Sequence, residues 1–178
     1  MSHILDWWNE LRDGAAPLPY MLIDCAGIDG GLERLPRTIF SELECLFTGE
    51  LAEELADVGG YLGRLKSLDD ATLHIVADLL ARQVGLLLLL PEPDPGVAEP
   101  SFAQMHRHLR KFNVVYGPDS KPLFWRYYDP RVLPDVLGVL DAAQLRDFFG
   151  PAQGMVCTDH EGQVLTLSLQ RGVLVNAH

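Results

Sequence analysis

Residues 123–133, LFWRYYDPRVL, decide how the chain folds at its centre, because the stretch changes character midway. Its first half is rich in aromatic residues and suits the two-residue period of a strand, which would place Leu123, Trp125 and Tyr127 on one face and 124, 126 and 128 on the other. Asp129 then offers a capping oxygen, and Pro130 fits the first turn of a helix. Because the next proline, Pro134, interrupts a longer helix, the sequence predicts a strand, a short 3₁₀ turn and a helix from Pro134.

Apolar runs and turn signals on either side of this stretch predict further strands and helices. A hairpin is expected over residues 113–128, with strands at 114–116 and 122–128. Further strands are expected at 20–26, 61–65 and 85–90, and as a terminal pair at 155–158 and 163–169. Helices are expected at 67–82, from Ser101 and from Asp141, each opened by a capping-box pattern: Ser67 with Asp70, Ser101 with Gln104, and Asp141 with Gln144. The fold class predicted is α/β (α+β mixed), with a mixed β-sheet flanked by helices and a C-terminal β-hairpin.

The length and the apolar content fit one compact domain. The chain has 178 residues, of which 48% are hydrophobic, enough to bury a core. Residues 91–100, PEPDPGVAEP, contain four prolines and are expected to form an extended loop. We therefore predict a single domain over residues 1–178, and the sequence leaves open two lobes, 1–90 and 101–178, joined by this loop.

Charge and cysteine content narrow the classes of partner. Acidic residues outnumber basic ones by 25 to 14, which disfavours a nucleic-acid surface and suits either a solvated face or a basic protein partner. The three cysteines are widely spaced, as in a protein of a reducing compartment. The N-terminal segment lacks the cationic start of a signal peptide, and the longest apolar run, 84–90, is far shorter than a membrane helix. We expect a cytoplasmic protein that contacts no membrane.

The charged residue Asp24 interrupts an apolar strand and should have a partner, because a carboxylate buried alone is costly. Arg126 is the partner we expect, as a structural ion pair without a catalytic role. Asp24, Arg126, Asp129 and Arg131 together could instead bind an anion, and the sequence leaves this alternative open.

Patterns typical of enzymes or metal sites are absent from the sequence. It has no G-x-S-x-G, P-loop, G-x-G-x-x-G or H-E-x-x-H pattern. His106 and His108 are two positions apart on a predicted helix and would project about 200° from each other, so they could not hold one ion together. We expect a protein that is not an enzyme and has no cofactor and no metal.

Several segments carry a family resemblance. FWRYYDPRVL, preceded by HLRKF at 108–112 and followed by LRDFFGP at 145–151, resembles the bacterial type VI secretion effector chaperone or adaptor family, also called Tap or TEC. PYMLIDCAG at 19–27 and the run at 46–65 are similar to the N-terminal half of that family. The resemblance covers roughly residues 19–151.

The resemblance implies a non-enzymatic cytoplasmic adaptor that holds a toxic effector and helps load it onto the VgrG spike. Its expected partners are therefore a type VI effector and VgrG. The residues that match the family motif are Trp125, Arg126, Tyr128, Asp129, Pro130 and Arg131. Whether they touch partners or only build the junction is left open, and an immunity-type or other protein-binding module remains the alternative.

Overall fold

The computed structural model describes residues 2–14, 16–96, 98–117 and 119–177. Within these residues seven strands form one sheet and two more form a separate hairpin, and every pairing is antiparallel. The sheet runs in the order β2 (Phe40–Cys45), β3 (Gly60–Leu65), β1 (Tyr20–Asp24), β4 (Gly85–Leu89), β7 (Gly154–Thr158), β8 (Val164–Gln170) and β9 (Val173–Ala177). The hairpin consists of β5 (Val114–Tyr116) and β6 (Pro122–Phe124).

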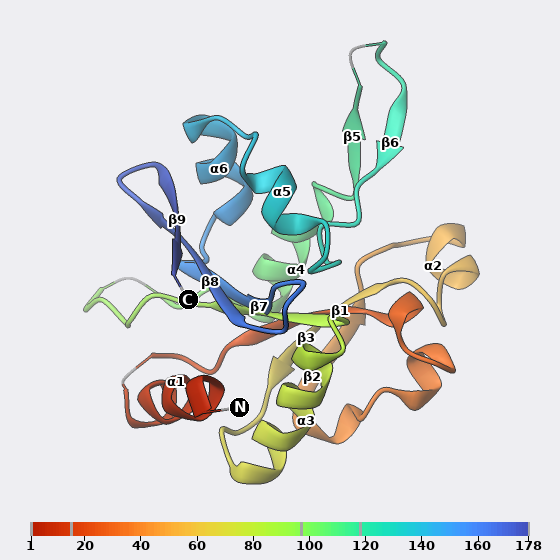
Figure 1. Cartoon of the computed structure of the whole chain (residues 1–178). Helices are drawn as coiled ribbons and strands as arrows, with labels where there is room; N and C mark the ends of the chain where they lie inside the picture. Colours follow the sequence, from red (N-terminus) through yellow and green to blue (C-terminus); the bar gives the residue numbers. More distant parts are fainter. Residues whose placement is uncertain (1, 15, 97, 118, 178) are drawn as a thin grey trace.

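Helices cover both faces of this sheet (Figure 1). One face carries α1 (Ser2–Asp13) and α3 (Asp70–Ala81). The other carries α4 (Phe102–Arg110), α5 (Leu133–Leu137) and α6 (Ala142–Phe149). The short α2 (Glu50–Glu54) lies beyond β2, and three 3₁₀ turns follow β1: η1 (Cys25–Gly27), η2 (Gly31–Arg34) and η3 (Arg37–Ile39).

The central strand β1 explains why two separate cores form. All five of its residues are buried, and they alternate between the two faces. Tyr20 and Leu22 join the core under α4, α5 and α6, whereas Met21 and Ile23 join the core under α1 and α3. Trp8 of α1 is fully buried in the second core, and its indole N–H donates to the carbonyl oxygen of Leu68 at 3.1 Å. A strand covered on both faces needs this continuous apolar sequence.

The predicted α/β class, with a sheet flanked by helices, is confirmed, but the sheet expected to be mixed is antiparallel between all of its described strands. The terminal pair predicted at 155–158 and 163–169 is present, but it is part of the main sheet, since β7 pairs with β4. Strands from both sides of the Pro-rich loop therefore lie in one sheet. Residue 97 of that loop lies outside the described residues.

Two of the three expected capping boxes are confirmed. Ser101 opens α4 and Asp141 opens α6, each with reciprocal hydrogen bonds to the glutamine three residues later. The third was wrong: α3 is capped by Asp69, whose carboxylate accepts from the amide of Thr72 at 2.8 Å. Asp69 competes successfully for the cap because its own position, and not that of Ser67, adjoins the first helical turn.

Two strand predictions also need correction. The strand expected at 122–128 ends at Phe124; the amide of Trp125 still donates to the carbonyl of Asn113, the next position in the β5–β6 register, and the chain turns away after it. A further strand, β9, was not predicted; it pairs with β8 after a tight turn at Arg171 and Gly172, both with positive φ. None of the helices in the described ranges is long and apolar enough to cross a membrane.

Candidate functional site

The family-motif segment meets the end of β1 at a cluster of two carboxylates and two guanidinium groups, which we call the Arg–Asp junction: Asp24, Arg126, Asp129 and Arg131. Asp24 is the last residue of β1 and is fully buried. Arg126 donates from Nη2 to Asp24 Oδ2 at 2.5 Å, so the two residues expected to pair are in contact. Arg131 Nη2 lies 3.6 Å from the same oxygen.

The carboxylate of Asp129 binds Arg131 through both of its oxygens. Its Oδ1 accepts from the amide and from Nε of Arg131 at 3.0 and 2.8 Å, and its Oδ2 accepts from Nη2 at 2.9 Å. Arg126 Nη2 is 3.7 Å from Asp129 Oδ2. The backbone carbonyl of Asp129 also accepts from the amides of Val132 and Leu133, which starts the turn into α5. The carboxylate therefore fixes the direction of the chain and the position of the arginine together.

The pKa values of the two carboxylates are shifted in opposite directions. Burial raises the pKa of Asp24 above its ordinary value of 3.8, although Arg126 acts in the other direction. Burial also disfavours the ionised form of Asp129, but the hydrogen bonds from Arg131 outweigh it and the pKa of Asp129 lies below 3.8. Asp24 Oδ1 is buried and has no hydrogen-bond partner among the described residues. The difference follows from the number of donors each carboxylate receives.

The aromatic residues of the motif segment anchor the junction to β3 and to the helices α4 and α6. Tyr128 is buried and lies against Gly60 of β3, where a Cβ would come within 2.5 Å of the ring. Its ring meets Phe47 edge to face at a centroid distance of 6.5 Å. The Tyr127 hydroxyl donates to the carbonyl of Leu109 at 3.0 Å. Trp125 is half-buried and packs on Phe148, with ring centroids 5.0 Å apart.

The structure brings Arg126, Asp129 and Arg131 together with Asp24, whereas Trp125 packs on α6, and only some of the motif residues reach the surface. Tyr128, Asp129 and Pro130 are buried, whereas the side chains of Arg126 and Arg131 are 45% and 52% exposed. The two arginines are thus the charged groups of the motif that a partner could reach. Each already faces a carboxylate, so the junction offers little uncompensated positive charge to an anion.

The two histidines considered for a metal site point to different parts of the fold. His106 Nε2 lies 2.7 Å from the carbonyl oxygen of Cys45, and His108 Nε2 lies 3.0 Å from that of Phe148. Among the described residues no group of three or more His, Cys, Asp or Glu side chains is placed to hold a metal ion.

An apolar groove that the sequence did not predict lies beside the junction. Its volume is about 310 Å³, and Phe124, Arg126 and Tyr128 form one wall. Phe47 and the residues around α2, namely Leu51, Leu55 and Val58, form the other. The helical stripe Leu51, Leu55 and Val58 is visible in the sequence, but nothing in its spacing indicates that it faces a groove instead of the core.

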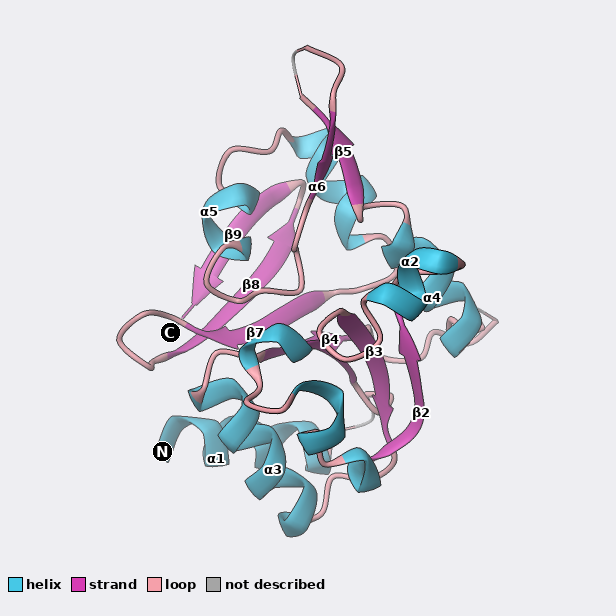
Figure 2. Cartoon of the chain, turned by 90° about the vertical axis from the view of Figure 1, so that its right-hand side faces the viewer, coloured by secondary structure: helices cyan, strands magenta, loops and turns pink. Residues whose placement is uncertain are grey.

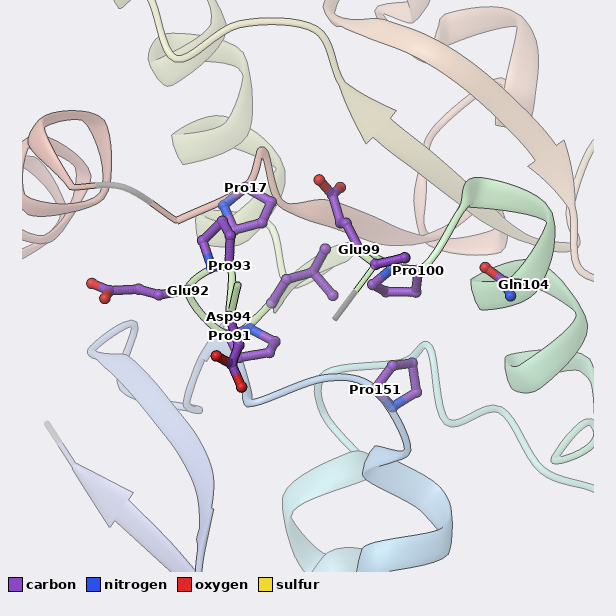
Figure 3. Close-up of a pocket in the computed structure, with 11 residues that line it drawn as sticks. Pro17, Pro91, Glu92, Pro93, Asp94, Glu99, Pro100, Gln104 and Pro151 are labelled. Carbon is purple, nitrogen blue, oxygen red and sulfur yellow. The ribbon is translucent and has the colours of Figure 1, made fainter. Parts of the chain in front are cut away.

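A larger hollow of about 610 Å³ lies under the Pro-rich loop (Figure 3). Proline rings make up much of its wall: Pro17, Pro91, Pro93, Pro100 and Pro151. The carboxylates of Glu92 and Glu99 point away from these rings, and Glu99 pairs with Arg64 at 2.7 Å. The hollow is therefore an apolar recess next to a loop, and neither glutamate points its carboxylate into it.

Comparison with known protein families identifies the group to which this fold belongs. The model of a family described as a domain of unknown function, DUF4123, matches residues 19–147, well over half of the chain. The chain belongs to the DUF4123 family. The match begins just before β1 and ends in α6, so it contains the Arg–Asp junction, the β5–β6 hairpin and the groove, but not β7, β8 or β9. Searches of curated proteins and of solved structures gave no significant match.

Proposed function

We propose that this DUF4123 protein is a non-enzymatic adaptor that binds a type VI secretion effector and helps load it onto the VgrG spike. The observation that carries the proposal is the family match over residues 19–147, since DUF4123 is generally linked to type VI effector adaptors. The segments whose resemblance to that adaptor family was noted in the sequence, from 19–27 to 145–151, fall almost entirely within this match.

The geometry of the motif favours a structural role for its charged residues over binding of a substrate anion. In the Arg–Asp junction each guanidinium faces a carboxylate at 2.5 to 2.9 Å, and the arrangement joins β1 to the segment before α5. Charge-balanced networks of this kind hold elements together, and they leave little driving force for binding a substrate anion. The adaptor would act in the cytoplasm, before the effector leaves the cell.

Co-purification tests this proposal. The tagged full-length chain is expressed with a candidate effector and a VgrG-type spike, and bound proteins are identified by mass spectrometry. We expect both partners to be recovered with the chain. Recovery of the toxin alone, together with inhibition of its activity, would favour an immunity-type protein instead, and recovery of neither partner would contradict the adaptor role.

A further inference from the structure

The β5–β6 hairpin projects from the body of the protein and exposes large apolar side chains. Figures 1 and 2 show it standing away from the main sheet and from the helices around it. Tyr116 is 72% exposed, Phe124 66% and Leu123 53%. Half of the exposed large hydrophobic residues in the described part of the chain lie on these six hairpin positions. A concentration of this kind marks an interaction site more often than scattered apolar residues do.

The groove described above continues this exposed surface toward α2. Phe124 belongs to both, because it is exposed on the hairpin and also lines the groove. Val58, across the groove, is 47% exposed. Leu51 and Leu55 complete that wall. Hairpin and groove together form one apolar surface, which we call the hairpin–α2 surface.

Acidic side chains border this surface on the α2 side. Glu50, Glu53, Glu54 and Asp57 are all exposed, and none of them forms an ion pair with another described residue. The one cation in the groove lining, Arg126, is paired with the buried Asp24. An apolar floor beside unpaired carboxylates is complementary to a segment with apolar residues on one side and lysine or arginine next to them.

We propose that the hairpin–α2 surface docks an amphipathic helix of the effector whose polar flank is basic; this inference rests on the adaptor function proposed above. The groove is walled by side chains from α2 and Phe47, so it can recognise apolar residues at helical spacing. Strand addition would instead follow the backbone edge of β5 or β6 and would not use the α2 wall. Phe124 is the expected anchor, because it is aromatic, accessible and central to both parts of the surface.

A photo-cross-linking amino acid at position 124 tests the location and the occupant. The full-length chain carrying it is co-expressed with the candidate effector and spike, and the matched control places the same group at Val139, which is 82% exposed but lies outside the surface. We expect position 124 to cross-link to an effector peptide with apolar residues at helical spacing and nearby Lys or Arg. Cross-links from Val139 only, to the spike, to a second copy of the chain, or to an acidic peptide would each overturn the inference.

Substitutions separate failure of this inference from failure of the adaptor function. Phe124→Asp should lower effector recovery at least about tenfold, as for an aromatic interface anchor, while Val139→Asp leaves it unchanged. Circular dichroism and the unfolding midpoint check that each variant is folded. If wild type and Phe124→Asp recover the effector equally, the docking site is wrong and the adaptor function stands. If wild type recovers neither effector nor spike, the adaptor function fails, and this inference fails with it.

A charge reversal on α2 tests the basic flank separately. The variant with Glu53→Lys and Glu54→Lys should recover several-fold less effector at low salt, because the two new cations offset Glu50 and Asp57 and the attraction for a basic segment is lost. Its recovery should also depend less on salt than that of wild type. Unchanged recovery and unchanged salt dependence would contradict a basic occupant.

Discussion

At the scale of single residues, the two buried carboxylates of the junction differ in the number of hydrogen-bond donors they receive: Asp24 has too few, and Asp129 has several. Asp24 depends on Arg126 for its one short hydrogen bond, and its Oδ1 has no partner in the described part of the chain. Asp129 receives three hydrogen bonds from Arg131. Loss of Arg126 and loss of Arg131 therefore have different consequences for stability. Each leaves a different carboxylate without its partner, and a buried charge left alone costs more than the net contribution of the pair.

Arg126→Ala should lower the free energy of unfolding by about 1–3 kcal/mol, the usual cost of leaving a buried acceptor unsatisfied. The value is below that of a fully buried pair because Arg126 is 45% exposed and water can reach part of the site. Urea unfolding measures it. Arg107→Ala, which removes an exposed arginine that has no ion pair among the described residues, should change the same quantity by less than about 0.5 kcal/mol.

The two carboxylates should shift stability with pH in opposite directions. The contribution of Asp129 is complete above 3.8 and is lost as the pH falls through its lowered folded pKa, whereas the penalty of ionised Asp24 is relieved as the pH falls through its raised folded pKa. Below pH 3.8 the wild type should thus lose its stability advantage over Asp129→Asn. As the pH falls from neutral, its stability should rise relative to that of Asp24→Asn. Unfolding midpoints measured across this pH range would refute both assignments if the three profiles ran parallel.

At the scale of elements, the absence of a side chain at one position of β3 decides how closely the motif segment packs on the sheet. The Tyr128 ring can pack this closely on β3 only because position 60 is glycine. The sequence predicted β1, β3 and β4 from their apolar runs, and it predicted the caps of α4 and α6 from local pairs of residues. It could not predict that β6 ends at Phe124, because the aromatic alternation continues beyond it and only the tertiary contacts of Trp125 and Tyr127 interrupt the strand.

Gly60→Ala should destabilise the fold by about 1–3 kcal/mol, since its Cβ would meet a rigid aromatic ring and force it to move. The change is measured by chemical unfolding. Gly138→Ala is the matched control, because its Cβ would make only ordinary contacts at 3.4 Å and its φ of −65° suits alanine. Equal effects of the two substitutions would argue against close packing of Tyr128 on β3.

Asp141→Ala should remove the cap of α6 and cost about 0.5–2 kcal/mol, because two amides, those of Ala143 and Gln144, lose their acceptor. Asp147→Ala changes an exposed acid near the other end of the same helix, where a negative charge is unfavourable to the helix dipole, and it should be neutral or slightly stabilising. Thermal unfolding compares them. A larger loss from Asp147→Ala than from Asp141→Ala would contradict the capping assignment.

At the scale of the whole molecule, the excess of acidic residues and the exposed apolar hairpin together define how the protein can associate. The formal net charge is −11, so association with a basic partner should be faster at low ionic strength. The expected Asp24–Arg126 contact followed from the cost of burying a charge, whereas the groove did not follow from any pattern. Its walls come from α2 and the hairpin, which are more than fifty residues apart in the chain and meet only in the folded molecule.

The adaptor function is tested most directly by reconstituted loading of the effector onto the spike. A tagged VgrG-type spike is mixed with the candidate effector, with and without this chain, and the effector retained on the spike is quantified. We predict that retention requires the chain and that the Phe124→Asp variant supports it poorly. Equal retention with and without the chain would contradict the adaptor role.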